Sequence, residues 1–139
     1  SMLSRLTIFF KRPVYGRIAA GMPITANQEN GEYYPMDTRF ININGYSRED
    51  FFFLRVKGDS MEPGIMDGDL VLVRHQPRVE TNEVAVVLCD NEDATVKRVT
   101  VAGNKMILNS DNRSYPPQIY NASDCCVIGK VLQRIGRVK

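Results

Sequence analysis

The stretch from Leu54 to Val73 most constrains the fold, because it breaks into short runs that are separated by turn residues. Leu54-Arg55-Val56-Lys57 alternates apolar and polar residues, which is the pattern of a half-buried strand. Leu70-Val71-Leu72-Val73 is a short apolar run, typical of a buried strand. Three clusters of turn residues lie between them: Gly58-Asp59, Pro63-Gly64 and Asp67-Gly68-Asp69. The prolines and glycines prevent a long helix here, so the stretch predicts strand, tight connection and strand.

The same pattern of short runs and frequent turns continues along the chain. Glu83–Cys89 and Cys126–Leu132 are strongly β in composition, and no long helical period is present. Residues 47–50 are compatible with a single capped helical turn. The aromatic cluster Phe51-Phe52-Phe53 is most simply core. The sequence therefore predicts a mostly-β domain.

Ser60 lies between two turns and beside an apolar sheet. A nucleophile held on rigid supports would occupy such a place, but so would an ordinary turn serine, which is the more common case. This stretch alone does not decide between the two.

Lys97 gives the serine a possible partner. In the run Ala94–Val99, Thr95, Lys97 and Val99 share one face of an extended strand. If Val99 faces inward, Lys97 does too, and burial lowers the pKa of an amine until it is a usable base near neutral pH. A serine and a neutral lysine form a known nucleophile–base pair. The spacing alone favours the other interpretation, an exposed and solvated Lys97-Arg98 pair.

Three separated motifs resemble one family. GDSMEPGIMDGDLVLV at 58–73 and ATVKRV at 94–99 look like the C-terminal peptidase domain of LexA-type repressors, a family shared with phage repressors and the UmuD mutagenesis protein. The spacing between Ser60 and Lys97 also resembles that of the family. Upstream, residues 16–21 (GRIAAG) resemble the family's self-cleavage segment. The resemblance extends from about Pro13 to Val138.

The resemblance implies a specific chemistry. Ser60 would be the nucleophile and Lys97 the general base of a self-cleaving serine peptidase. The scissile bond would be Ala20-Gly21, and the backbone N–H groups of Asp59 and Ser60 would form the oxyanion hole. The alternation and small residues of this segment allow an extended substrate, although a small-residue turn between two strands is the simpler local interpretation. A twisted, β-rich fold with serine and lysine in a cleft is the fold expected of the family.

The resemblance also implies partners. Cleavage would be stimulated by activated RecA filaments in the SOS response to DNA damage, and a homodimer would form through the C-terminal strand. DNA would be bound only through a domain absent from this chain. The alternatives are a UmuD-like DNA polymerase accessory protein and a non-catalytic dimerisation or sensor module. A signal peptidase, which uses a similar dyad, is disfavoured because this chain shows no membrane anchor.

Composition limits the other possibilities. The formal charge of +2 is too small to argue for nucleic-acid binding by these residues, and no apolar run approaches the roughly 18 residues of a membrane span. We expect no signal peptide, because Ile8-Phe9-Phe10 is too short for its apolar core. No spacing of Cys and His fits a zinc site, so we predict no metal and no other cofactor. A pairing of Ser60 with His75, the single histidine, stays open as an alternative.

The three cysteines are expected to be free thiols, which fits a cytoplasmic protein. Cys125 and Cys126 are neighbours on alternate sides of a strand and are poorly placed to pair with each other. For the domain organisation, we expect residues 1–12 to be a linker or an expression remnant and residues 13–139 to be the peptidase and dimerisation domain. The cleavage segment spans about 16–26. The loop 110–117 is assigned to turn formation.

Overall fold

The chain folds around one mixed sheet, seen in a computed structural model that describes residues 9–136. Four single turns of 3-10 helix accompany it: η1 (Ile24–Asn27), η2 (Thr38–Phe40), η3 (Arg48–Asp50) and η4 (Ala122–Asp124). Within the described part, no helix is long and apolar enough to cross a membrane. The prediction of a mostly-β domain is confirmed. The strands are β1 (Phe9–Tyr15), β2 (Gln28–Asp37), β3 (Phe51–Arg55), β4 (Leu70–His75), β5 (Glu83–Cys89), β6 (Thr95–Ala102), β7 (Lys105–Asn109), β8 (Gln118–Asn121) and β9 (Cys125–Ile135).

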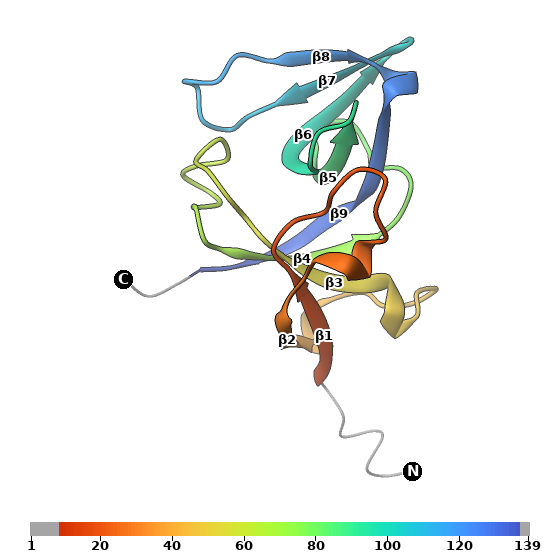
Figure 1. Cartoon of the computed structure of the whole chain (residues 1–139), viewed down its shortest axis with the longest axis vertical. Coiled ribbons are helices and arrows are strands. Elements are labelled where there is room, and N and C mark those ends of the chain that lie inside the picture. The colour runs from red at the N-terminus through yellow and green to blue at the C-terminus, as the bar shows by residue number, and fades with distance from the viewer. Residues whose placement is uncertain (1–8, 137–139) are drawn as a thin grey trace.

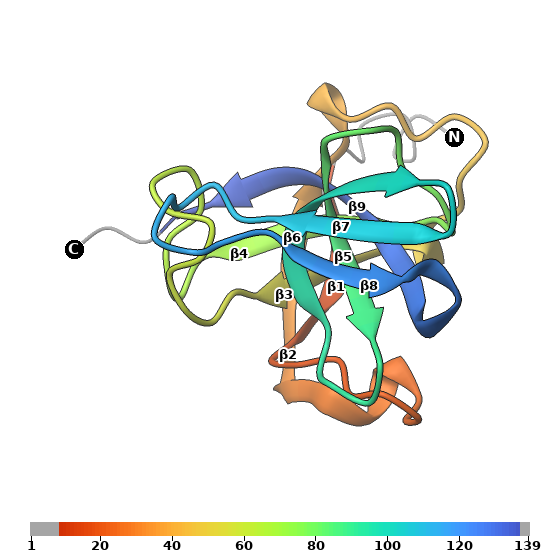
Figure 2. The same ribbon diagram turned by 90° about the horizontal axis from the view of Figure 1, so that it is seen from above.

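The strand order is β2-β1-β3-β4-β9-β5-β6-β7-β8, which divides the sheet into two parts. Strands β1–β4 lie at the bottom of Figure 1 and β5–β8 at the top, with β9 running between them. Figure 2 looks down on the molecule from the side of β7 and β8. The pairing of β9 shifts register once against β4 and once against β5. Such irregularities increase the local twist, so β9 turns one part of the sheet relative to the other.

Strands β3 and β4 form the centre of the lower part. Phe51–Leu54 and Leu70–Val73 are buried on both faces of the sheet. The prediction that the aromatic cluster forms core is confirmed. The sequence assigned the alternating run Leu54–Lys57 to a half-buried strand, whereas the antiparallel ladder with β4 begins at Phe51, opposite Arg74, and ends at Arg55.

The first described strand extends the domain toward the N-terminus. β1 begins at Phe9, pairs antiparallel with β2 and runs parallel to β3 at Val14 and Tyr15. Residues 9–12, assigned to a linker from the sequence, therefore lie within the sheet. The rest of that assignment, residues 1–8, lies outside the described residues.

The expectation of three free thiols is wrong for two of them. Cys89 and Cys125 face each other as Cα partners on β5 and β9, and they form a disulfide. Cys126 follows on the opposite side of the strand and is a free, exposed cysteine. The sequence could not show this pair, because it depends on the long-range pairing of β5 with the last strand.

The C-terminal strand is only partly an edge. Residues 129–135 of β9 pair with β4, and residues 125–130 pair with β5. Among the described residues, 131–135 therefore have a ladder on one side only. Residues 125–128 likewise pair with β5 alone within the described sheet, so each end of β9 has its ladder on one side.

Gly129 tests how closely β9 packs against β4. A Cβ at this position would overlap the carbonyl oxygen of Arg74 and would lie 2.7 Å from Cγ1 of Val73. Because backbone cannot move aside cheaply, we expect Gly129→Ala to lower the thermal midpoint by more than about 5 °C. Gly64→Ala is the matched control, since its nearest heavy atom lies 3.9 Å away. Equal midpoints for the two variants, measured by circular dichroism, would contradict this packing.

Candidate active site

Ser60 lies in the connection between β3 and β4, which is tied at its base. The N–H of Val56 donates to the carbonyl of Asp69 at 2.8 Å, and the N–H of Gly58 donates to the carboxylate of Asp67 at 2.7 Å. The N–H of Gly68 donates back to the carbonyl of Val56 at 2.8 Å, so the backbone pairing of β3 and β4 continues beyond the strands to this point. As a result the turn that carries Ser60 is supported by the most buried part of the sheet.

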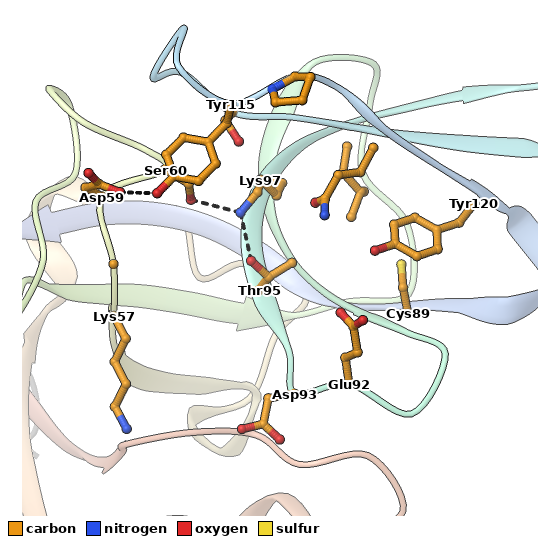
Figure 3. Close-up of a pocket in the computed structure, with 15 residues that line it drawn as sticks. Lys57, Asp59, Ser60, Cys89, Glu92, Asp93, Thr95, Lys97, Tyr115 and Tyr120 are labelled. Atoms are coloured by element: carbon orange, nitrogen blue, oxygen red, sulfur yellow. Dashed lines mark hydrogen bonds between the residues drawn. The ribbon is translucent and has the colours of Figure 1, made fainter.

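Lys97 reaches Ser60 from β6, in the other part of the sheet. Its Nζ lies 2.9 Å from Oγ of Ser60 and 2.9 Å from Oγ1 of Thr95, as Figure 3 shows. The residue is only 7% exposed. The prediction that Lys97 faces inward is confirmed, and the alternative of a solvated lysine is wrong.

Burial lowers the pKa of the Lys97 amine below its ordinary value. No carboxylate within the described residues forms an ion pair with it, and the carbonyl of Val96, 3.4 Å away, is its remaining polar neighbour. An amine in this setting is more easily neutral than an exposed lysine. A neutral Nζ at hydrogen-bond distance from a hydroxyl has the geometry of a general base.

Two pockets meet at Ser60. The larger one, of about 370 Å³, is also lined by Lys97, Thr95 and Tyr115. The smaller one, of about 180 Å³, is lined by Ser60 together with residues of the segment 16–17 and of the start of β6. The two pockets give room for a peptide chain that passes over Ser60.

The first half of the predicted cleavage segment already lies at this cleft. The N–H of Ala94, just before β6, donates to the carbonyl of Ile18 at 2.8 Å. Arg17 forms an ion pair with Asp93 at 3.1 Å. Both Ile18 and its neighbour Ala19 are buried. These contacts hold residues 16–19 beside the start of β6.

The predicted scissile bond is not at the serine. Ala20 and Gly21 line neither pocket, and they lie in a turn in which the N–H of Met22 approaches the carbonyl of Ala19 at 3.4 Å. Gly21 has a φ of 76°, a left-handed conformation that glycine adopts readily. The structure therefore brings Ser60 and Lys97 together but leaves Ala20-Gly21 outside the cleft.

The two backbone groups predicted for the oxyanion hole have no protein acceptor. Among the described residues, the N–H groups of Asp59 and Ser60 donate no hydrogen bond. Asp59 is exposed and Ser60 is half-buried, so both N–H groups lie at the wall of the cleft and can reach a group inside it. They are available to an oxygen atom of a substrate.

His75 is remote from this arrangement. It is exposed at the end of β4 and lines a separate pocket of about 280 Å³, which does not include Ser60. The alternative pairing of Ser60 with His75 therefore has no structural support. Residues 9–136 also contain no group of three or more His, Cys, Asp or Glu side chains that could hold a metal ion.

The sequence missed the role of the loop 110–117. Asn112 does shape a turn, because its Oδ1 accepts the N–H of Ser114 at 3.0 Å. Asn112 and Tyr115 also contact the turn at Asp59 and Ser60. No local signal could have shown this, since a polar loop with an asparagine and a tyrosine is ordinary.

Residues 13–132 match the Peptidase S24-like family. The chain belongs to this family. The LexA repressor of Geobacillus sp. (strain WCH70) is 36% identical over 121 residues, which are 86% of this chain and 56% of the relative. The LexA repressors of Bacillus cytotoxicus and Staphylococcus aureus (strain Newman) are each 40% identical over the same length and shares. The chain thus spans about half the length of the curated relatives it matches, and the resemblance to LexA-type peptidase domains is confirmed.

The lowered pKa of Lys97 predicts a pH-dependent stability. The unfolded chain binds a proton up to pH values near 10.5, whereas the folded chain loses it earlier, so folded stability rises with pH between the two pKa values. We expect Lys97→Met to be more stable than its parent by roughly 1 kcal/mol at neutral pH, because it removes a buried charge. This difference should shrink as the pH approaches 10.5.

The measurement is urea unfolding from pH 6 to about pH 10. The parent and each variant also carry Ser60→Ala, which prevents cleavage. Lys105→Met makes the same change of side chain at an exposed position and is the control. A difference for Lys97→Met that stays constant with pH would show that its amine is not perturbed.

Proposed function

We propose that this chain is the self-cleaving serine peptidase domain of a LexA-like transcriptional repressor, with a Ser60–Lys97 dyad that cuts Ala20-Gly21. The observation that carries the proposal is the buried amine of Lys97, 2.9 Å from the Ser60 hydroxyl, in a cleft that already holds the residues before the scissile bond. Membership of a peptidase family supports the chemistry, and the names of the relatives support the repressor.

The reaction follows from the geometry. Oγ of Ser60 attacks the carbonyl carbon of Ala20 while Nζ of Lys97 accepts the hydroxyl proton. The oxyanion forms next to the free N–H groups of Asp59 and Ser60. The C–N bond to Gly21 breaks, and Lys97 delivers its proton to the leaving amine. Water, deprotonated by Lys97, then attacks the acyl ester. The bond between the carbonyl carbon and Oγ breaks, Lys97 returns the proton to Oγ of Ser60, and Ala20 is left with a carboxylic acid that ionises to a carboxylate.

The resting arrangement makes this reaction a switch. Ala20 and Gly21 must leave their turn and enter the cleft, while Ile18 can keep its bond to Ala94. An activator needs only to favour the docked state and adds no catalytic group. By the family resemblance, this activator is a RecA filament in the SOS response to DNA damage.

The same proposal extends to assembly and location. A homodimer would form through the last part of β9, residues 131–135, where the described ladder is one-sided. Light scattering at high micromolar concentration measures this, and a monomer would contradict it. DNA binding would belong to a part of the protein outside this chain, and the protein would act in the cytoplasm.

A UmuD-like polymerase accessory protein is the alternative with the same chemistry, and a non-catalytic sensor module is the alternative without it. The two active candidates differ in what precedes residue 3, where a helix-turn-helix domain supports the repressor and a short tail supports the accessory protein.

The nucleophile is tested by intact mass after prolonged incubation at alkaline pH. We expect the parent to yield two fragments, one ending at Ala20 and one beginning at Gly21. Ser60→Ala should stay intact, because it removes the attacking oxygen. Ser123→Ala, an exposed serine of η4, is the control and should cleave like the parent. Cleavage of Ser60→Ala at the parental rate would remove Ser60 from the mechanism.

The base is tested by the pH dependence of the rate. Because burial lowers the pKa of Lys97, the neutral fraction and the rate should rise with pH and begin to rise below pH 10.5. Lys97→Arg keeps the charge but cannot lose its proton, so its rate should fall to below about 1% of the parental rate. Lys105→Arg, at an exposed position, should leave the rate unchanged. A flat pH profile in the parent, or an active Lys97→Arg, would refute the assignment of Lys97 as the base.

A further inference from the structure

The loop 110–117, between β7 and β8, lies directly against the turn that carries Ser60. Both ribbon views show the two loops next to each other (Figures 1 and 2). The backbone N–H of Asn112 donates to the carbonyl of Ser60 at 3.0 Å, and its side-chain Nδ2 donates to the carbonyl of Asp59 at 3.0 Å. The hydroxyl of Tyr115 donates to the carboxylate of Asp59, and Figure 3 shows the tyrosine ring beside Ser60.

These bonds fix the two peptide planes on either side of the Ser60 Cα. A trans peptide is planar, so its N–H and C=O point in opposite directions. Asn112 Nδ2 holds the carbonyl of Asp59, and the N–H of Ser60 in the same plane is therefore directed away from Asn112. This is the N–H that has no acceptor among the described residues. The bond from the N–H of Asn112 fixes the next plane and, with it, the direction of the Ser60 side chain.

Tyr115 acts on the charge of Asp59. A carboxylate turned toward a developing oxyanion would repel it, and such repulsion is strong at distances of a few ångströms. The hydroxyl of Tyr115 instead holds this carboxylate by a hydrogen bond. The bond leaves the N–H groups of the turn as the polar groups offered to the oxyanion.

The loop is itself anchored on the strand that carries the base. Arg98, next to Lys97 on β6, pairs with Asp111 at 2.7 Å. The connections therefore form a closed ring from Ser60 through the loop and β6 to Lys97 and back to Ser60. A ring of this kind restrains the nucleophile relative to the base.

We propose that Asn112 and Tyr115 are positioning residues of this peptidase, which orient the N–H of Ser60 for the oxyanion and hold the Asp59 carboxylate away from it. The inference rests on the proposed function. Neither residue takes part in proton transfer, so their loss should lower the rate without changing its dependence on pH.

The test compares self-cleavage rates in two variants and two matched controls. Asn112→Ser removes the Nδ2 donor but keeps an oxygen that can accept the N–H of Ser114, and Tyr115→Phe removes only the hydroxyl. Asn44→Ser and Tyr33→Phe make the same changes at exposed sites elsewhere. We expect Asn112→Ser to be about 10- to 100-fold slower than the parent and Tyr115→Phe to be about threefold slower or more. Both controls should stay within twofold of the parent.

The pH profile and the thermal midpoint separate positioning from simple loss of structure. The midpoint of the pH profile should stay where it is in the parent, because the burial of Lys97 is unchanged. A shifted pH midpoint would show that the loop acts by covering Lys97, and it would overturn the inference. Parental rates in both variants would also overturn the inference. A loss of rate that is fully explained by the fraction of unfolded protein would overturn it too.

An NMR measurement that does not depend on cleavage distinguishes failure of the proposed function from failure of the positioning role. If the parent stays intact at every pH, the proposed function fails, but the contacts can still be tested in the Ser60→Ala chain. Asn112→Ser should then move the carbonyl ¹³C resonance of Asp59 upfield, because that carbonyl loses a donor, while Asn44→Ser should not. An unchanged resonance would refute the contact itself.

Discussion

The site depends on the burial of the Lys97 amine without an ionic partner among the described residues. A buried lysine usually has a carboxylate partner, and such a partner would raise its pKa and keep it protonated. Here its polar neighbours are two hydroxyls and a carbonyl. Nearby carboxylates are bonded to other groups, in the pairs Arg17–Asp93, Arg98–Asp111 and Tyr115–Asp59. Burial then lowers the pKa of Lys97, with no carboxylate bonded to its amine among the described residues.

Ser60 and Lys97 come together only through the arrangement of the whole sheet, because they lie in its two different parts. Ser60 is carried by the connection of β3 and β4, and Lys97 by β6, on the other side of β9. The two parts are joined through β9, and its two register shifts increase the local twist at that junction. Close packing of β9 on β4, which requires glycine at position 129, is therefore linked to the geometry of the dyad.

What could be predicted from the sequence was local. The apolar runs predicted the strands, because they depend on near neighbours in the chain. The inward face of Lys97 was predicted by the family resemblance, since the spacing alone favoured a solvated Lys97-Arg98 pair. The pairing of Cys89 with Cys125 could not be predicted, because it depends on the register of strands that are far apart. The contacts of Asn112 with Asp59 and Ser60 belong to the same class, since they join residues that are neighbours only after the sheet has formed.

The proposed cleavage segment is already held in part beside β6, which limits how the proposed switch can work. Ile18 is buried and bonded to Ala94, so the register of the segment beside β6 is already set before any cleavage. The movement that remains is the opening of the turn at Ala20 and Gly21. If only a fraction of molecules has this turn opened and docked, the observed rate is the rate of the docked state multiplied by that fraction. An activator that adds no catalytic group can therefore accelerate cleavage by at most the reciprocal of the docked fraction, and the spontaneous rate and the activated rate together measure how strongly the turn is closed.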